Sequence, residues 1–214
     1  ENASLTGVLS GDDVSLVTAG ATGSFADKNV GVAKAVSTSG FALGGVDASN
    51  YTLTDPTYNA NITAASLNIT GVTVNNKVYD GTTLATLNTA SATLTGNSGT
   101  DVINLVSTGA TGTFANKNAG ISKTVATSGF TLVGTDKDNY VLIQPELAGD
   151  IVPKGLTVTA KDLSKAYGTT MTFAGTETTT AGLVPGDVVT GITITSSGAA
   201  ASSSVGSYVI SASG

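Results

Sequence analysis

The sequence repeats itself with a period of 89 residues. The string GATG at residues 20–23, followed by FADKN at 25–29, recurs as GATG at 109–112 followed by FANKN at 114–118. The same offset relates further pairs along the chain: Phe41 and Phe130, Asn50 and Asn139, Tyr51 and Tyr140, Ile62 and Ile151, Leu67 and Leu156. A period of this length is too long for one coil of a solenoid and is typical of a β-sandwich module.

A second motif extends the array beyond these two copies. KVYDGTT at residues 77–83 returns as KAYGTT at 165–170, with one Asp missing. The first copy lacks this opening, the second is complete, and the third diverges after its KAYGTT string and stops before any counterpart of the Asn-Tyr strand at 139–140. The junctions are short, which favours a semi-rigid, rod-like array. We therefore expect three modules: 1–71, 72–152 and 153–214.

The composition indicates β-structure throughout. Thr and Val are abundant and suit a pleated sheet, while 27 Gly residues punctuate the chain. Turn signals recur about every eight to twelve residues, and helical periodicity is absent. The sequence therefore predicts an all-β chain of tandem, Ig-like β-sandwich modules, with β-grasp-like modules as the alternative topology.

The residue types exclude several classes of function. The chain has no Cys, His or Trp, and all nine of its basic residues are Lys, so Ser-His triads, thiol nucleophiles and the usual zinc ligand sets cannot form. A net charge of −6 argues against a nucleic-acid partner, and no apolar run approaches the length of a membrane helix. We expect no enzyme, no catalytic residues, no cofactor, no metal site and no membrane insertion.

Acidic residues gather at two predicted turns, Asp12–Asp13 and Asp136 to Asp138. Calcium stiffens many extracellular arrays, but the spacing of a calcium loop is absent and Lys137 interrupts the second cluster. We interpret both clusters as solvated turn residues.

The tyrosine motifs are interpreted as structural. Tyr79 and Tyr167 are expected to be core or edge aromatic residues whose hydroxyl groups bind the backbone. Asp80 and Gly81 predict a tight turn in which the glycine supplies a positive φ. The alternative is a tyrosine platform that binds a ligand at the surface. The structural interpretation also covers the neighbours of these residues in the two motifs: Lys77, Lys165 and Gly168.

A lysine recurs at a position whose phase points inward. Lys34 shares its strand face with Val30, Val32 and Val36, and Lys123 shares the equivalent face with Ala119, Ile121 and Val125. A β-bulge that shifts the phase, or a lysine that snorkels at the sheet rim, explains this pattern. The alternative is a buried pair or a self-formed lysine cross-link, for which two later-strand residues are conceivable partners: Asn50 and Asn139.

These motifs carry a family resemblance over essentially the whole chain. NKVYDGTT at residues 76–83, with the later GF at 129–130 and DNY at 138–140, resembles the YDG repeat of long bacterial surface proteins. GLTVTAKD at 155–162, with the following KAYGT, resembles the MBG repeat of the YGX type, a mostly bacterial Ig-like module. Both repeats occur in large exported adhesins, including filamentous-haemagglutinin-like exoproteins of two-partner secretion.

The resemblance implies an extracellular, β-rich segment of a bacterial surface or secreted exoprotein. Such a segment acts as a stalk, a spacer or a fibre-forming unit in adhesion or in a biofilm matrix. Its expected partners are neighbouring repeats of the same protein. Because the first copy lacks its opening strand and the third its closing strand, self-association into fibres by strand addition is a variant of this expectation. The alternative function is a module that binds a glycan or a host or matrix protein through its loops.

Overall fold

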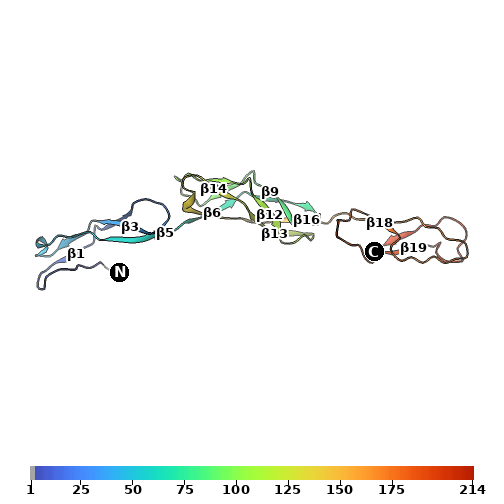
Figure 1. The fold of residues 1–214 in the computed structure, drawn as a ribbon, viewed down its shortest axis with the longest axis horizontal. Helices are drawn as coiled ribbons and strands as arrows, with labels where there is room; N and C mark the ends of the chain where they lie inside the picture. Colours follow the sequence, from blue (N-terminus) through green and yellow to red (C-terminus); the bar gives the residue numbers. More distant parts are fainter. Residues whose placement is uncertain (1–2) are drawn as a thin grey trace. The chain divides into compact units, whose positions relative to one another are not determined.

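The computed structural model of the chain describes residues 3–214. Within that range the regular structure is β-strand apart from two short 3-10 turns, η1 (Ala48–Asn50) and η2 (Lys137–Asn139), which confirms the all-β prediction. The strands of the described residues form seven sheets that fall into two compact units. Figure 1 shows the order of the strands along the chain by colour, from blue at the N-terminus to red at the C-terminus. We call residues 3–62, 65–152 and 155–214 the first, second and third repeats. None of the described helical segments is long and apolar enough to cross a membrane.

The first unit comprises Glu1–Gly71, Ala92–Gly109 and Phe130–Gln144. Its antiparallel sheets pair β1 with β4, β2 with β3 and β3 with β5, and β11 with β14, whereas a three-stranded sheet runs in the order β10-β6-β15 with β15 parallel to β6. The strands of this unit are β1 (Ser15–Val17), β2 (Thr22–Phe25), β3 (Gly31–Ser39), β4 (Ala42–Gly44), β5 (Thr57–Ile62), β6 (Ala65–Thr70), β10 (Thr93–Thr95), β11 (Asn104–Val106), β14 (Thr131–Val133) and β15 (Tyr140–Ile143).

The second unit comprises Val72–Ser91, Ala110–Gly129 and Pro145–Gly214. Its main sheet has six strands in the order β7-β9-β12-β13-β16-β8, and two further antiparallel pairs, β17-β18 and β19-β20, belong to the third repeat. The strands are β7 (Thr73–Asn75), β8 (Lys77–Val78), β9 (Leu84–Asn88), β12 (Thr111–Phe114), β13 (Gly120–Ser128), β16 (Glu146–Val152), β17 (Thr157–Ala160), β18 (Thr178–Ala181), β19 (Thr193–Thr195) and β20 (Ser211–Ser213).

The 89-residue period of the sequence reappears in the strand register. The β2-β3-β5 sheet of the first repeat has the same pairing as β12-β13-β16 of the second, and each strand start is displaced by the period. In the second repeat β9 pairs with the free side of β12, and β8 pairs with β16. The described part of the first repeat has no counterpart of β7, β8 or β9, so its sheet has only three strands.

β6 lies before the expected module boundary at residue 72 but pairs with strands that follow it. Its neighbours are β10 and β15, both from the second repeat. Leu67 and Ile69, which alternate with polar residues along β6, are buried, as a strand with one covered face requires. The pairing therefore groups β6 with the strands of the second repeat.

Both long strands contain the bulge that the lysine phase indicated. The register shifts between Gly31 and Lys34 in β3 and between Gly120 and Lys123 in β13. The bulges hold the only two described non-glycine residues with positive φ, Ala33 at 51° and Ser122 at 47°. A side chain on the facing strand satisfies each bulged amide: the N–H of Ala33 donates to Asn61 and that of Ser122 to Asp150, both at 2.8 Å.

The bulges correct one prediction about the strand faces. Val32 and Ile121 were expected to share an inward face with the lysines, but each side chain is 84% exposed. The extra residue of the bulge breaks the two-residue alternation, so the residue before it no longer shares a face with Val36 or Val125. Val125, two residues beyond the bulge, is fully buried.

The best-packed described core lies in the six-stranded sheet of the second unit. Ala85, Phe114, Val125 and Ile151 form a buried cluster from four different strands. Partly buried side chains extend this cluster: Val74, Tyr79, Leu87 and Leu147. The KVYDGTT motif therefore lies directly beside the core.

Candidate functional site

The KVYDGTT motif folds into a tight turn around one carboxylate. Asp80 Oδ1 accepts hydrogen bonds from the backbone and the hydroxyl of Thr82, both at 2.9 Å, and from Lys77 Nζ at 2.8 Å. Gly81 has φ of +81°, as the sequence predicted. The Lys77 ammonium, followed by the Thr82 amide and hydroxyl, lowers the pKa of Asp80 to about 2. The turn is therefore held by charge and by backbone conformation together.

The same turn lies against the third repeat. A Cβ built on Gly81 would approach Val184 Cγ1 to 2.8 Å, and Val184 itself is buried. The Tyr79 hydroxyl donates to Asp187 Oδ1 at 3.1 Å. The expected backbone partner for this hydroxyl is wrong: Tyr79 packs beside the core of its own repeat, but its polar end binds a side chain of the next one.

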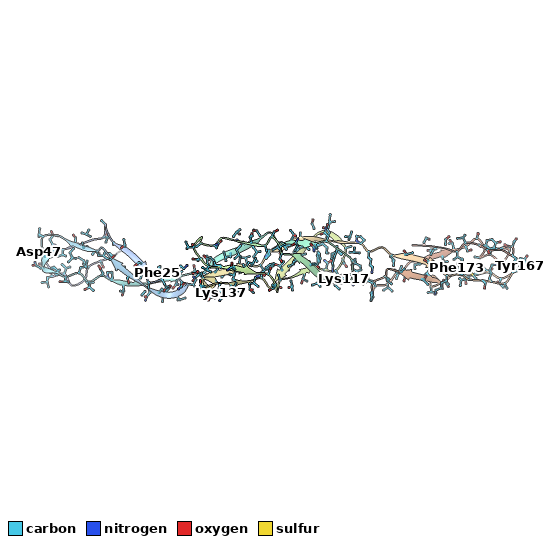
Figure 2. The ribbon with its side chains drawn as sticks, turned by 90° about the horizontal axis from the view of Figure 1, so that it is seen from above. Phe25, Asp47, Lys117, Lys137, Tyr167 and Phe173 are labelled. Carbon is cyan, nitrogen blue, oxygen red and sulfur yellow. The ribbon has the colours of Figure 1, made fainter. Side chains whose placement is uncertain are left out.

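The equivalent motif of the third repeat differs at its tyrosine. Lys165 Nζ donates to the carbonyl oxygens of Thr169 at 2.9 Å and Ala200 at 2.8 Å, and Gly168 keeps a positive φ of +82°. Tyr167 is 72% exposed, so the prediction of a core or edge residue is wrong here. The loss of one Asp shortens the turn, and Tyr167 lines an open hollow. Figure 2 labels Tyr167.

The recurring lysines Lys34 and Lys123 bind the loop that precedes their own strand. Lys34 Nζ forms an ion pair with Asp27 and donates to the Asn29 carbonyl oxygen at 2.7 Å. Lys123 Nζ donates to Asn116 Oδ1 at 2.6 Å, the position equivalent to Asp27. Each lysine therefore holds the FADKN or FANKN loop of its own repeat in place by these polar contacts. We call these loops, residues 25–29 and 114–118, the lysine loops.

The two asparagines considered as cross-link partners have different environments. Asn139 Oδ1 accepts from the N–H of Val30 at 2.8 Å, and its Nδ2 donates to Asn29 Oδ1 at 3.2 Å. Asn50 is exposed. A covalent bond from Lys34 or Lys123 to either asparagine stays a prediction, which the intact mass of the chain tests.

Lys28, in the first lysine loop, forms the most highly charged contact of the first unit. Its ammonium pairs with Asp101 and with Asp136, the latter at 2.8 Å, so a lysine of the first repeat bridges two carboxylates of the second. The Lys28 ammonium is the main cause that lowers the pKa of both carboxyl groups, and they in turn raise the pKa of Lys28. Asn29 and Val30, the two residues that follow Lys28, bind Asn139, so three consecutive residues of the first repeat take part in this contact.

The second lysine loop makes the equivalent contact in the second unit. Lys117, 89 residues after Lys28, lies 3.5 Å from Asp187 of the third repeat. Tyr79 and then Asp187 raise the pKa of Lys117. The loop lysine of each of the first two repeats therefore pairs with an aspartate of the repeat that follows.

Sequence reasoning found the strings that carry these contacts but assigned the residues no role. FADKN and FANKN established the period, and Asp12 and Asp136 belong to the two acidic clusters that were interpreted as solvated turn residues. The recurrence of an unassigned lysine at the period was the available signal. Its partners could not be identified, because pairing between repeats depends on how successive sheets meet.

Comparison with known proteins agrees with the repeat analysis. Residues 1–59 and 63–148 match the YDG domain, and residues 156–214 match the MBG domain of the YGX type. Neither the curated proteins nor the solved structures contain a match to the chain. The YDG matches cover more than half of the sequence, and the chain therefore belongs to the YDG domain family, with an MBG domain at residues 156–214.

Proposed function

We propose that this chain is a structural repeat segment of an adhesive protein on the bacterial surface or secreted from the cell, where it acts as a stalk or spacer without enzymatic activity. A spacer must transmit orientation from one module to the next, which needs contacts at each junction beyond the covalent chain. The domain family supports a β-rich repeat module of this kind.

The observation that carries the proposal is the recurring lysine contact. Lys28 binds Asp101 and Asp136 of the second repeat, and Lys117 binds Asp187 of the third. Exposed ion pairs add little to stability. Their value here lies in orientation: an ammonium that pairs with two carboxylates on different loops restrains rotation at the junction.

Small-angle scattering of the full chain tests this function. A rod of stacked modules about 100 Å long predicts a radius of gyration near ~30 Å, and a single compact globule predicts ~17 Å. In Lys28→Ala/Lys117→Ala we expect a broader distribution of interatomic distances, because both junction contacts are lost. The control is Lys154→Ala/Lys161→Ala, which removes the same charge from two exposed lysines that form no ion pair within residues 3–214. A compact wild-type particle, or identical profiles for the two variants, contradicts the stalk.

Fibre formation is the finer form of this proposal. If copies of the chain associate end to end, the scattering mass rises with protein concentration and falls with added salt where charged contacts carry the association. A monomer mass that stays constant over the concentration series would contradict fibre formation by this chain but would be consistent with a spacer.

A specific feature favours binding as a second candidate function. The third repeat has an open hollow of about 640 Å³ whose lining includes Tyr167, Phe173 and Tyr208. Figure 2 labels Tyr167 and Phe173 in the C-terminal part of the chain. Exposed aromatic faces suit the apolar face of a sugar or a protein side chain. We expect Tyr167→Ala to abolish binding on a glycan array, whereas Tyr58→Ala, which removes a 49% exposed tyrosine of the first repeat, leaves it unchanged.

A further inference from the structure

The carboxylates that receive Lys28 are held in place by their own repeat. Asp101 Oδ2 accepts from the Tyr140 hydroxyl at 2.6 Å, and Asp136 Oδ2 accepts from the N–H of Val102 at 2.9 Å. The Oδ1 atoms of both residues bind Lys28. One oxygen of each carboxylate therefore fixes the side chain, and the other binds the incoming ammonium. We call this pair of residues the acceptor pair.

The first repeat builds the same acceptor pair from equivalent residues. Asp12 Oδ2 accepts from the Tyr51 hydroxyl at 2.5 Å, and Asp47 Oδ2 accepts from the N–H of Asp13 at 2.9 Å. The tyrosine hydroxyl is itself held alike in both repeats, by a backbone N–H at 3.0 Å from Leu9 or from Ser98. All three bonds thus have a counterpart at the 89-residue offset.

The acceptor pair of the first repeat keeps these three bonds but lacks the hydroxyl that Thr135 donates to Asp136, because Val46 stands at the equivalent position. It also differs in its occupancy. Among residues 3–214, no group donates to Asp12 Oδ1 or Asp47 Oδ1. The asparagine beside each acceptor pair also differs in burial. Asn139, which binds Asn29 and Val30, is half-buried, whereas its equivalent Asn50 is exposed. The first repeat therefore presents a preorganised set of acceptors whose counterpart in the second repeat has a known occupant.

Lys28 of the same repeat cannot fill this surface. Asp47 lies at the end of the first repeat opposite Phe25, which begins the lysine loop (Figure 2). Lys28 is also already paired with Asp101 and Asp136. The donor must therefore come from another repeat.

We propose that Asp12, Asp47 and Asn50 form a docking surface for the lysine loop of another YDG repeat, whose ammonium would bind both Oδ1 atoms. The inference rests on the proposed stalk function, because it extends the same contact to one more junction. Asn50 would receive the two residues that follow the lysine, as Asn139 receives Asn29 and Val30. Each YDG repeat then has a donor end and an acceptor end, which makes the array directional.

The 89-residue period allows a direct test in the full chain. Residue 90 is equivalent to residue 1, so residues 1–89 fused ahead of the complete chain add one period with a native junction sequence. A zero-length carbodiimide couples a lysine only to a carboxylate that it contacts, and mass spectrometry identifies the joined peptides. In this extended chain we expect Lys28–Asp12 or Lys28–Asp47 products together with Lys28–Asp101 or Lys28–Asp136 products.

The Lys28–Asp101 product is the internal control of the same reaction. If it forms and no Lys28–Asp12 or Lys28–Asp47 product appears, the docking surface is wrong and the stalk contact stands. If none of these products forms, Lys28 does not contact Asp101 or Asp136, and both the stalk function and the docking surface are wrong. Asp12→Asn/Asp47→Asn in the original chain, or Lys28→Ala in the added copy, should remove the new product. Asp13→Asn in the original chain, which neutralises a neighbouring exposed acid, should leave it.

Discussion

Gly81 and Gly168 share a backbone conformation but differ in what surrounds them. Their φ angles are +81° and +82°, yet a Cβ on Gly81 would meet Val184, whereas Gly168 has open space within 4 Å. Gly168→Ala should therefore lower the free energy of unfolding by about 1 kcal/mol, because alanine disfavours the left-handed backbone conformation. Gly81→Ala should cost about 1–3 kcal/mol more, because Val184 must also shift. Urea unfolding of both variants checks the order, and equal losses would contradict the close approach to Val184.

Asp80 makes the stability of its turn depend on pH. The folded state holds the Asp80 pKa near 2 against an ordinary value of 3.8. A lowered carboxyl pKa stabilises the folded state above the ordinary value, and that stabilisation disappears as the pH falls from 3.8 towards 2. Asp80→Asn should therefore unfold more readily than the wild type at neutral pH, and the difference should shrink through this window. A difference that is constant from pH 7 to pH 2 would argue against the Lys77–Asp80 pair.

At the scale of the strand, the same phenylalanine has two environments. Phe114 of β12 is 1% exposed, and its equivalent Phe25 of β2 is 37% exposed. β12 has β9 on its free side, with Ala85 and Leu87 beside Phe114, whereas β2 has no described partner there. Phe114→Ala should lower the free energy of unfolding by about 3–5 kcal/mol. Phe25→Ala should lower it clearly less, because folding buries less of the apolar surface of Phe25.

Hydrogen exchange of β13 and β3 measures the two effects separately. Each strand is the central neighbour of the mutated strand in its own sheet. Loss of amide protection in β13 of Phe114→Ala, with little change in β3 of Phe25→Ala, is the expected outcome. Comparable losses would mean that the strand partners do not decide the burial of this residue.

Strand positions could be predicted only where the two-residue alternation was unbroken. In β6 the alternation holds, and Leu67 and Ile69 are buried two residues apart; in β16 Gly149 and Ile151 are buried at the same spacing. In β3 and β13 the bulge was one of the two accounts of the lysine phase, but its position was not predicted, so Val32 and Ile121 were assigned to the wrong face. A bulge is stabilised by the facing strand, through Asn61 or Asp150, and that partner lies 28 residues away.

At the scale of the whole molecule, the Lys28 contact should respond to acid. Lys28 lowers the pKa of Asp101 and Asp136, so the contact is complete above the ordinary range of an aspartate and is lost as the pH falls through and below it. The raised pKa of Lys28 keeps the ammonium charged beyond the ordinary range of a lysine. We expect the scattering profile of the wild type to broaden in acid. Lys28→Ala/Lys117→Ala should already be broad at neutral pH and change little.

The sequence by itself determined the properties that depend on local chemistry. The 89-residue period, the all-β character, the positive φ at Gly81 and the family of the chain follow from strings of a few residues whose backbone preferences act over one turn or strand. The lysine loops belong to this group, since their residues were visible as a repeated string.

Only the tertiary structure decided the environment of each repeated residue. Phe25 and Phe114, Asn50 and Asn139, and Tyr79 and Tyr167 are equivalent in sequence, yet one member of each pair is covered and the other is more exposed. The cause is the same in each case: burial and charge pairing require a surface from a distant strand or from the next repeat. The Lys28 contact with Asp101 spans 73 residues, and no local pattern specifies which carboxylate meets that ammonium.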